Sequence, residues 1–170
     1  RAQICAENIA AGGLRSAGMC WLRSLAAFSK TPCAREDTAA SFDLSVDFAM
    51  REKMFIAAFN HLVPFPGTPL YQELEQTRQL NSERWWLDDD FYFGQTPVNP
   101  QKMTSRELEL NCLRARRQFF SIRAILRRAM DFKCNCSSLM NFWRYLTTNA
   151  LLRREISGKR GTPLGAMDET

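Results

Sequence analysis

The 170-residue chain is 45% hydrophobic and 11% aromatic, and it carries a formal net charge of +5. This composition excludes a disordered chain, no run approaches the roughly 18 apolar residues of a membrane span, and no secretion signal is visible. Residues 1–100 hold nine Lys and Arg against twelve Asp and Glu, whereas residues 101–170 hold fourteen against six. We therefore expect a cytoplasmic globular protein with a basic C-terminal part, and the absence of an initiating Met fits a piece of a longer protein.

The first 36 residues give the weakest structural predictions. Apolar residues within 3–18 indicate a weak helix that Gly12 and Gly13 interrupt. The stretch 19–36 begins with apolar residues, but charged residues and Pro32 then break any regular period. We treat 19–36 as atypical for the fold predicted for the rest of the chain.

A helix followed by a strand is predicted next. Asp37 and Thr38 can cap a helix, and apolar residues then recur at a period near 3.6 residues as far as Lys53. The continuous apolar run Met54–Phe59 suits a buried parallel strand. Helix then strand is half of a βαβ repeat, which favours an α/β fold.

A rigid turn follows the predicted strand. Three prolines between Pro64 and Pro69 fix φ and restrict the residues before them, while Gly67 is free to adopt a positive φ. Thr68 can cap a short helix that has Pro69 at its first position. The acidic, aromatic connection 81–100 comes next, and it is too aromatic for a solvated loop. We expect this connection to pack over the fold, with an aromatic wall for a substrate as the functional alternative.

Two helices are predicted in the basic part. Thr104 and Glu107 form a capping box, and apolar residues then step by four and three for over five turns, to about residue 130. A second helix, at about 137–157, is expected to pack through Leu139, Phe142, Leu146 and Ala150. The apolar face of the first helix consists of Leu108, Cys112, Ala115, Phe119, Ile122 and Leu126. The arginines expected mostly off that face are Arg114, Arg116, Arg117, Arg123, Arg127 and Arg128.

The six cysteines are expected to be reduced thiols, because the chain is long and shows no secretion signal. Cys134 and Cys136 offer two thiolates to a metal, but no second Cys or His pair lies at zinc spacing and His61 is the only histidine. We therefore predict no metal site. The cysteines are Cys5, Cys20, Cys33, Cys112, Cys134 and Cys136.

Several motifs together resemble radical S-adenosylmethionine (radical SAM) proteins that carry an N-terminal cobalamin-binding domain. This group includes enzymes acting on hopanoid lipids and on a bacteriochlorophyll precursor. The Pro-Phe-Pro-Gly-Thr-Pro turn is moderately specific for radical SAM families, and its combination with Trp-Trp-Leu-Asp and the arginine-rich helix is much more specific. The motifs are Asp37-Thr38 before a helix, Phe59-Asn-His-Leu62, Pro64-Phe-Pro-Gly-Thr-Pro-Leu-Tyr71, Trp85-Trp-Leu-Asp88 and Met103-Thr-Ser-Arg-Glu-Leu108.

The resemblance implies an α/β fold in which the chain forms the C-terminal edge of a partial TIM-type barrel, followed by a mainly helical C-terminal extension. Residues 1–80 would be the end of the barrel, and residues 81–170 would be the aromatic connection and the basic helical domain. Cofactor and substrate lie at the C-terminal ends of the strands in such barrels. The cofactor-binding residues that the resemblance implies are Phe59, Asn60, His61, Leu62, Pro66, Gly67 and Thr68.

The parent family uses S-adenosylmethionine and a [4Fe–4S] cluster, and the resemblance extends to cobalamin. The cluster is held by three cysteines spaced C-x-x-x-C-x-x-C, and this sequence has no such run. A second departure is that 19–36 stands where the family has a glycine-containing strand. We therefore predict the C-terminal portion of a radical SAM iron–sulfur enzyme that is inactive alone, has no catalytic residue of its own, and derives from a parent with a small-molecule or lipid-like substrate.

Two other hypotheses remain open at this stage. One is a basic helical binding module that contacts anionic lipid, RNA or a partner subunit, and such contact with a membrane would be peripheral. Nucleic acid is disfavoured, because the arginines are not interleaved with exposed aromatic residues. The other is a remnant without activity, which would fold poorly because a strand edge lacks its neighbours.

Overall fold

The computed structural model describes residues 38–82, 84–88, 90–131 and 135–158. These residues are mainly helical, and their β structure consists of isolated bridges, one of which pairs Leu80 with Val98 in antiparallel orientation. The predictions for 3–18 and 19–36, and for Cys134, lie outside the described residues. The helices are α3 Ala39–Arg51, α4 Pro69–Gln76, the 3-10 helix η2 Trp85–Leu87, α5 Ser105–Phe119, α6 Ile122–Ala129 and α7 Leu139–Gly158.

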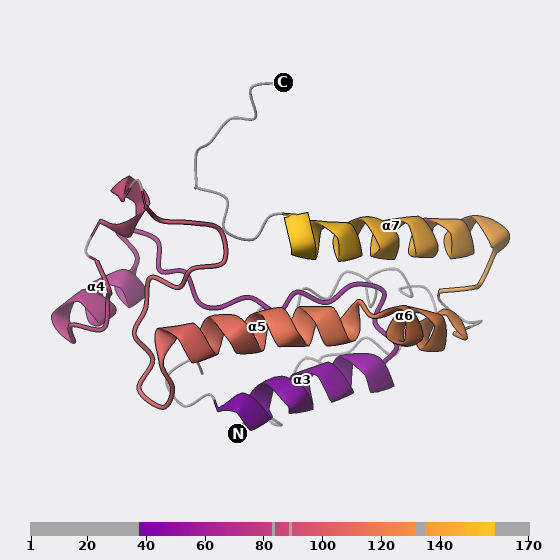
Figure 1. The fold of residues 1–170 in the computed structure, drawn as a ribbon, viewed down its shortest axis with the longest axis horizontal. Helices are drawn as coiled ribbons and strands as arrows, with labels where there is room; N and C mark the ends of the chain where they lie inside the picture. Colours follow the sequence, from indigo (N-terminus) through magenta and orange to yellow (C-terminus); the bar gives the residue numbers. More distant parts are fainter. Residues whose placement is uncertain (1–37, 83, 89, 132–134, 159–170) are drawn as a thin grey trace.

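Helix α3 begins and ends where its local chemistry dictates. Thr38 is the N-cap, as predicted, and its backbone N–H donates to Ser41 Oγ at 3.2 Å. The helix ends just before Lys53, which adopts a positive φ of 49° and so turns the chain back. Its inward face packs against α5, the central helix in Figure 1.

An extended stretch, 54–64, follows α3 and runs back toward α4 between α5 and α7 in the view of Figure 1, and its first part, 54–60, is called the extended segment. Within the described residues it has no strand partner, so the predicted strand at Met54–Phe59 and the barrel edge stay predictions. The segment is nevertheless well buried, and the Phe59 ring meets Phe119 of α5 edge-on at 5.5 Å. The main core joins α3, this segment and α5 through Phe42, Val46, Ala49, Met54, Ala57, Phe59, Leu108, Cys112, Ala115, Phe119 and Phe120.

The turn into α4 forms as predicted. Gly67 has a φ of +81°, a left-handed conformation that glycine adopts without strain. Thr68 Oγ1 accepts a hydrogen bond from Tyr71 N–H at 3.3 Å, and Pro69 occupies the first helical position. Both the turn and α4 lie at the end of the molecule remote from α6 (Figure 1).

The aromatic connection is packed only in part. Trp85 and Phe91 are buried and lie with their ring centroids 5.0 Å apart, which confirms the prediction for them. Trp86 contacts Tyr71 of α4 at 5.9 Å, but it stays exposed, as does Phe93. The connection therefore covers α4 and leaves an aromatic rim open to solvent.

The prediction of one continuous helix from Thr104 to about residue 130 is wrong. The capping box at Thr104 is present, but α5 ends at Phe119, and Ser121 caps a separate helix by accepting from Ala124 N–H at 3.3 Å. Because α6 starts in a new direction, Ile122 is 61% exposed and does not continue the apolar face of α5. The same change buries Arg128 on the inward side of α6.

Helix α7 forms where it was predicted but packs through different residues. Leu139 is 74% exposed and Ala150 is also exposed, so both are wrong as packing residues, whereas Phe142 and Leu146 are partly buried. Tyr145 and Asn149 are fully buried, and the Tyr145 hydroxyl donates to the Ile125 carbonyl at 2.8 Å. Across the described residues, no helix combines the length and apolar character needed to cross a membrane.

Candidate functional site

Side chains of the helices bind the carbonyl groups of the extended segment at both of its ends. At the end nearest α3, Arg128 of α6 and Asn149 of α7 reach the segment. At the other end, Arg116 of α5 does so. The two ends differ in what surrounds the arginine, and that difference locates the candidate site.

Arg128 is fully enclosed. Its Nη1 donates to the carbonyls of Met54 at 2.8 Å and Phe55 at 3.3 Å, and its Nη2 donates to the Phe119 carbonyl at 2.8 Å and to Asn149 Oδ1 at 3.2 Å. The guanidinium carbon also lies 3.6 Å from the centroid of the Phe119 ring, in cation–π geometry. Burial lowers the pKa of Arg128 to about 10, which leaves the group charged at neutral pH. This end is therefore a closed structural clamp.

Two asparagines complete the clamp. Asn149 Nδ2 donates to the Phe55 carbonyl at 3.2 Å. Asn135 Nδ2 donates to the Lys53 carbonyl at 3.1 Å and to the Arg128 carbonyl at 2.9 Å. Buried carbonyls need such partners, because leaving one unpaired costs about 1–3 kcal/mol. The clamp thus does locally what a neighbouring strand would do for a strand in a sheet.

Arg116 binds the backbone where the predicted strand ends, but only some of its N–H donors have acceptors. Its Nε donates to the Phe59 carbonyl at 3.0 Å, and its Nη2 donates to Asn60 Oδ1. Burial lowers the pKa of Arg116. Both of these acceptors are neutral, so the guanidinium brings a positive charge to this end of the segment.

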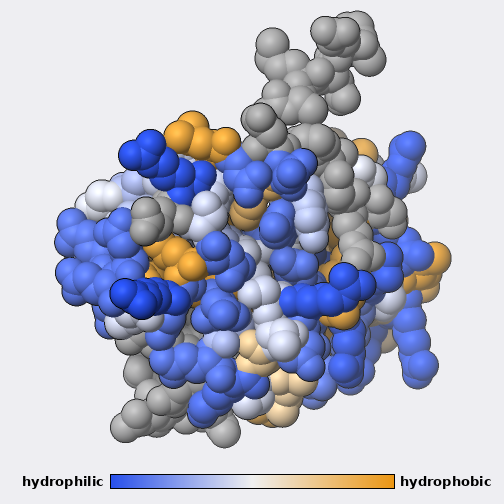
Figure 2. Space-filling model, turned by 60° about the vertical axis from the view of Figure 1, so that its left-hand side comes forward, coloured by the Kyte–Doolittle hydropathy of each residue, from blue (hydrophilic) through white to orange (hydrophobic). Residues whose placement is uncertain are grey.

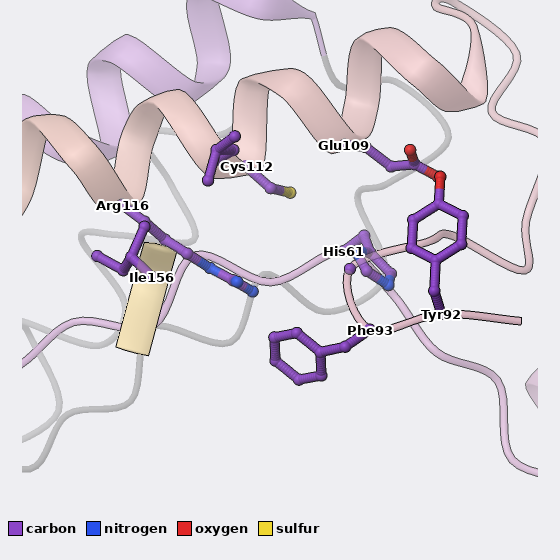
Figure 3. Close-up of a pocket in the computed structure, with 9 residues that line it drawn as sticks. His61, Tyr92, Phe93, Glu109, Cys112, Arg116 and Ile156 are labelled. Carbon is purple, nitrogen blue, oxygen red and sulfur yellow. The ribbon is translucent and has the colours of Figure 1, made fainter. Parts of the chain in front are cut away.

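A cavity of about 60 Å³ adjoins Arg116. Helix α5 supplies one wall, since Glu109, Cys112, Leu113 and Arg116 follow the i, i+3, i+4, i+7 spacing of a single helix face. Figure 3 shows the Arg116 guanidinium projecting from α5 toward the space bordered by His61 and Phe93. The complete lining is His61, Tyr92, Phe93, Gly94, Glu109, Cys112, Leu113, Arg116 and Ile156.

His61 is held neutral in this pocket. Burial and, to a smaller extent, the positive charge of Arg116 lower the pKa of His61 to about 4, although a hydrogen bond with the Gln95 backbone acts in the opposite direction. At neutral pH the imidazole is therefore an uncharged group that can both donate and accept a hydrogen bond. This state suits ligand positioning better than proton transfer near pH 7.

Glu109 closes the opposite end of the cavity wall. Its Oε1 accepts a hydrogen bond from Thr96 N–H at 2.9 Å, which ties the aromatic connection to α5. Cys112 lies between Glu109 and Arg116 and is buried. Among the residues that the structure describes, no group of three His, Cys, Asp or Glu side chains is placed to hold a metal ion.

The structure separates the predicted cofactor-binding residues into two sets. Phe59 lies in the core, Asn60 binds Arg116, His61 lines the cavity, and Leu62 beside it is half-buried. Residues 66–68 do not line the cavity. Pro66 and Gly67 are exposed, and Thr68 caps α4. Their part in cofactor binding stays a prediction.

Sequence reasoning missed the α5 side of the cavity. Arg116 is predicted off the apolar face and Glu109 has no predicted role, yet both share a face with Cys112, which is predicted on the apolar face and is buried. The available signal was the spacing, because residues three or four positions away from a core position return to nearly the same side of a helix. The sequence could therefore have predicted that these α5 residues share one face, but it could not predict which segment packs opposite that face.

The cofactors implied by the resemblance do not fit the described residues alone. Sites for drug-sized ligands usually measure about 300–1,000 Å³, so a cavity of about 60 Å³ cannot enclose S-adenosylmethionine. The described residues also offer no cluster ligands. The cavity can hold the head of a ligand, or form one wall of a larger site.

The comparisons with known proteins give one distant relative. Over 107 residues, or 63% of this chain, the sequence is 26% identical to bacteriochlorophyllide d C-12(1)-methyltransferase of Chlorobaculum tepidum. The match covers 22% of that enzyme, so the chain spans about a fifth of the length of this relative. No protein-family model and no solved structure matches the chain. The chain is thus distantly related to a methyltransferase.

Proposed function

We propose that this chain is the C-terminal part of a radical SAM enzyme of the cobalamin-dependent type and supplies one wall of its cofactor and substrate site. The cluster ligands would come from other parts of the enzyme, because the described residues do not provide them. The similarity to a methyltransferase and the motif combination from Asp37 onward support this assignment. The α/β barrel edge and the cytoplasmic location belong to the same proposal.

The observation that carries the proposal is the held strand exit. Arg116 fixes the backbone at Phe59 and the side chain of Asn60, so the chain leaves the core in one conformation. His61 follows directly and faces the cavity. A rigid, partly buried strand end beside a cavity is the arrangement expected where a barrel strand contributes to a site.

A chimera tests this function. The 107 matching residues of the Chlorobaculum tepidum methyltransferase are replaced by those of this chain, and the purified chimera is reconstituted anaerobically with iron and sulfide. We expect the visible absorbance of an iron–sulfur cluster and reductive cleavage of S-adenosylmethionine. This chain alone, treated in the same way, should show neither.

The controls separate a structural failure from a functional one. A chimera that carries Arg117→Gln should behave like the parent chimera, because Arg117 is exposed. Loss of cluster or of cleavage in the unmutated chimera, with a folded circular dichroism spectrum, contradicts the proposal. Cluster formation on this chain alone contradicts it as well.

A second candidate function rests on the outer surface of α6. Ile122, Leu126 and Met130 are each more than half exposed, and they lie one turn apart. Arg123 and Arg127 are exposed beside them. An apolar stripe bordered by arginines suits an anionic membrane surface, because the apolar side chains can enter the headgroup region while the arginines bind the anionic headgroups. We propose this surface as a peripheral contact with anionic lipid.

Vesicle sedimentation tests the lipid contact. The full chain should sediment with vesicles of phosphatidylserine and phosphatidylcholine but not with phosphatidylcholine alone, because the arginines require anionic headgroups. Leu126→Glu should abolish binding, whereas Leu110→Glu, at an exposed position of α5, should not. Figure 2 shows hydrophobic patches scattered over the face of the molecule that it presents, so the control also tests whether any exposed apolar residue would suffice. Absence of sedimentation would instead favour a protein or RNA partner.

A further inference from the structure

We propose that the cavity beside Arg116 binds the oxyanion head of a ligand, a carboxylate or a phosphate group, through the Arg116 guanidinium. The inference deepens the proposed function, because the cavity is the wall assigned above to the site. The binding itself is a property of this chain and can be measured without the rest of an enzyme.

The charge of Arg116 is the first argument. Its acceptors among the described residues are the Phe59 carbonyl and Asn60 Oδ1, and neither carries a charge. In the described part of the chain, Arg114 by contrast pairs with Asp43 at 3.0 Å. A partly buried guanidinium with neutral partners keeps an uncompensated positive charge, which favours an anion next to it.

The unused donors are the second argument. A guanidinium has five N–H donors in a planar fork. The two bonds to Phe59 and Asn60 occupy Nε and Nη2, and Nη1 has no acceptor among the described residues. Figure 3 shows the outer end of the guanidinium directed into the cavity. One edge of the Arg116 guanidinium is therefore fixed by these two bonds, and the other edge can donate to a ligand in the cavity.

The size and lining of the cavity are the third argument. A water molecule takes about 30 Å³ of liquid volume, so about 60 Å³ accommodates a small head group rather than a whole cofactor. Leu113, Phe93 and Ile156 line it with apolar surface. Such surface excludes water and strengthens an ion pair within the cavity. Phe93 and Tyr92 are 39% and 38% exposed, so a ligand stem can pass between the cavity and solvent beside their rings.

The other ionisable groups leave the Arg116 end of the cavity open to an anion. His61 is neutral at pH 7 and offers hydrogen bonding without charge. Glu109 carries the opposing charge, but seven residues of helix place it about 10 Å along α5 from Arg116, and its Oε1 is bound by Thr96 N–H. Tyr92 and Cys112 complete the ionisable lining. The Arg116 end of the cavity is thus its positive end.

The experiment titrates the full chain with inorganic phosphate and, separately, with propionate, at constant ionic strength held by chloride. His61 is the only histidine, so its Hε1 ring proton gives a single histidine signal in the proton NMR spectrum that reports on the cavity. We expect a saturable shift of this signal and a rise in the His61 pKa on binding, because the oxyanion offsets the charge of Arg116. Saturation by propionate alone indicates a carboxylate ligand, and saturation by phosphate alone indicates a phosphorylated one.

Arg116→Gln should weaken binding by at least about tenfold, and Arg117→Gln, at the exposed neighbour, should leave it unchanged. If Arg116→Gln fails to fold, Arg116→Lys keeps the charge without the planar fork and should bind more weakly than the unmutated chain. No saturable shift in the unmutated chain, or equal binding by Arg116→Gln, overturns the inference. If this chain binds the anion but the chimera is inactive, the anion site stands and the radical SAM assignment is contradicted. If the chimera is active but this chain does not bind the anion, the radical SAM assignment stands and the anion site is contradicted.

Discussion

The two ends of the extended segment 54–60 are held by the same chemistry and have different uses. At one end, Arg128 has its donors occupied by carbonyls and Asn149, and its guanidinium lies over Phe119. At the other end, Arg116 makes two such bonds and borders a cavity. A fully paired, fully enclosed arginine can only support structure. A partly paired one at a cavity is available to a ligand.

The difference arises from the helices that carry the two arginines. Arg128 lies on the inner side of α6, where Tyr145 and Asn149 of α7 close over it. Arg116 lies where the open aromatic connection, with Tyr92 and Phe93, takes the place of such a cover. Burial and pairing around an arginine, and not its presence in a basic helix, therefore distinguish the two roles.

The largest expected effect comes from removing the closed clamp. Arg128→Met keeps much of the side-chain volume but leaves the carbonyls of Met54 and Phe119 without a donor, and the Phe55 carbonyl with Asn149 alone. Each unpaired buried carbonyl costs about 1–3 kcal/mol, so we expect the free energy of unfolding to fall by roughly 3–5 kcal/mol. Urea unfolding followed by circular dichroism measures this change.

The neighbouring exposed arginine is the matched control for that measurement. Arg127→Met should change the free energy of unfolding by less than about 0.5 kcal/mol, because Arg127 lies on the solvent side of α6. If the two variants were equally stable, the enclosed clamp would not be structural and the contrast between the ends would be lost.

A pH titration of stability sharpens the contrast at the open end. The pKa of His61 is about 4 in the folded chain against 6.5 for an unperturbed histidine, so between these values the unfolded chain binds more protons. The contribution of His61 to stability is therefore full above pH 6.5 and is lost as the pH falls toward 4. We expect a loss of about 2–3 kcal/mol over this window, and His61→Gln should remove that part of the slope.

The closed end should contribute nothing to this pH window. Burial raises the pKa of Tyr145 to about 12, and the pKa of Arg128 is about 10, so neither group titrates between pH 4 and 6.5. Unfolding free energies measured by urea at several pH values, for the unmutated chain and for His61→Gln, separate His61 from the carboxylates. A slope that persists unchanged in His61→Gln would show that the imidazole is not held neutral.

Local signals in the sequence predicted local structure well. The caps at Thr38, Thr68 and Thr104 each begin a helix where expected, because a cap depends on a few neighbouring residues. The break at Ser121 was missed, since the apolar spacing continued through it and seemed to describe one helix. A serine able to cap a new helix was the signal against that interpretation.

The functional contrast between the arginines could not be predicted in the same way. Arg116, Arg127 and Arg128 look alike in a basic helix, and their surroundings depend on the turn at Ser121 and on segments far away in sequence. The predicted strand exit at 59–62 lies beside a cavity that His61 lines, and its part in cofactor binding stays a prediction. Its partner wall on α5 required the tertiary structure, because only packing shows which helix faces the segment.

The smallest expected effect tests whether the contrast is local. Thr104→Ala removes the capping box of α5, in which Glu107 N–H donates to Thr104 Oγ1 at 3.2 Å and Thr104 N–H donates to Glu107 Oε2 at 2.8 Å. Loss of a cap costs about 1 kcal/mol of stability, measurable by urea unfolding. The box contacts neither Arg116 nor Arg128, so the His61 titration and phosphate binding should stay as they are in the unmutated chain. If this mild destabilisation also shifted the His61 pKa, the weaker anion binding of Arg116→Gln would have two equally good explanations. One is the loss of the Arg116 charge, and the other is a general loosening of α5.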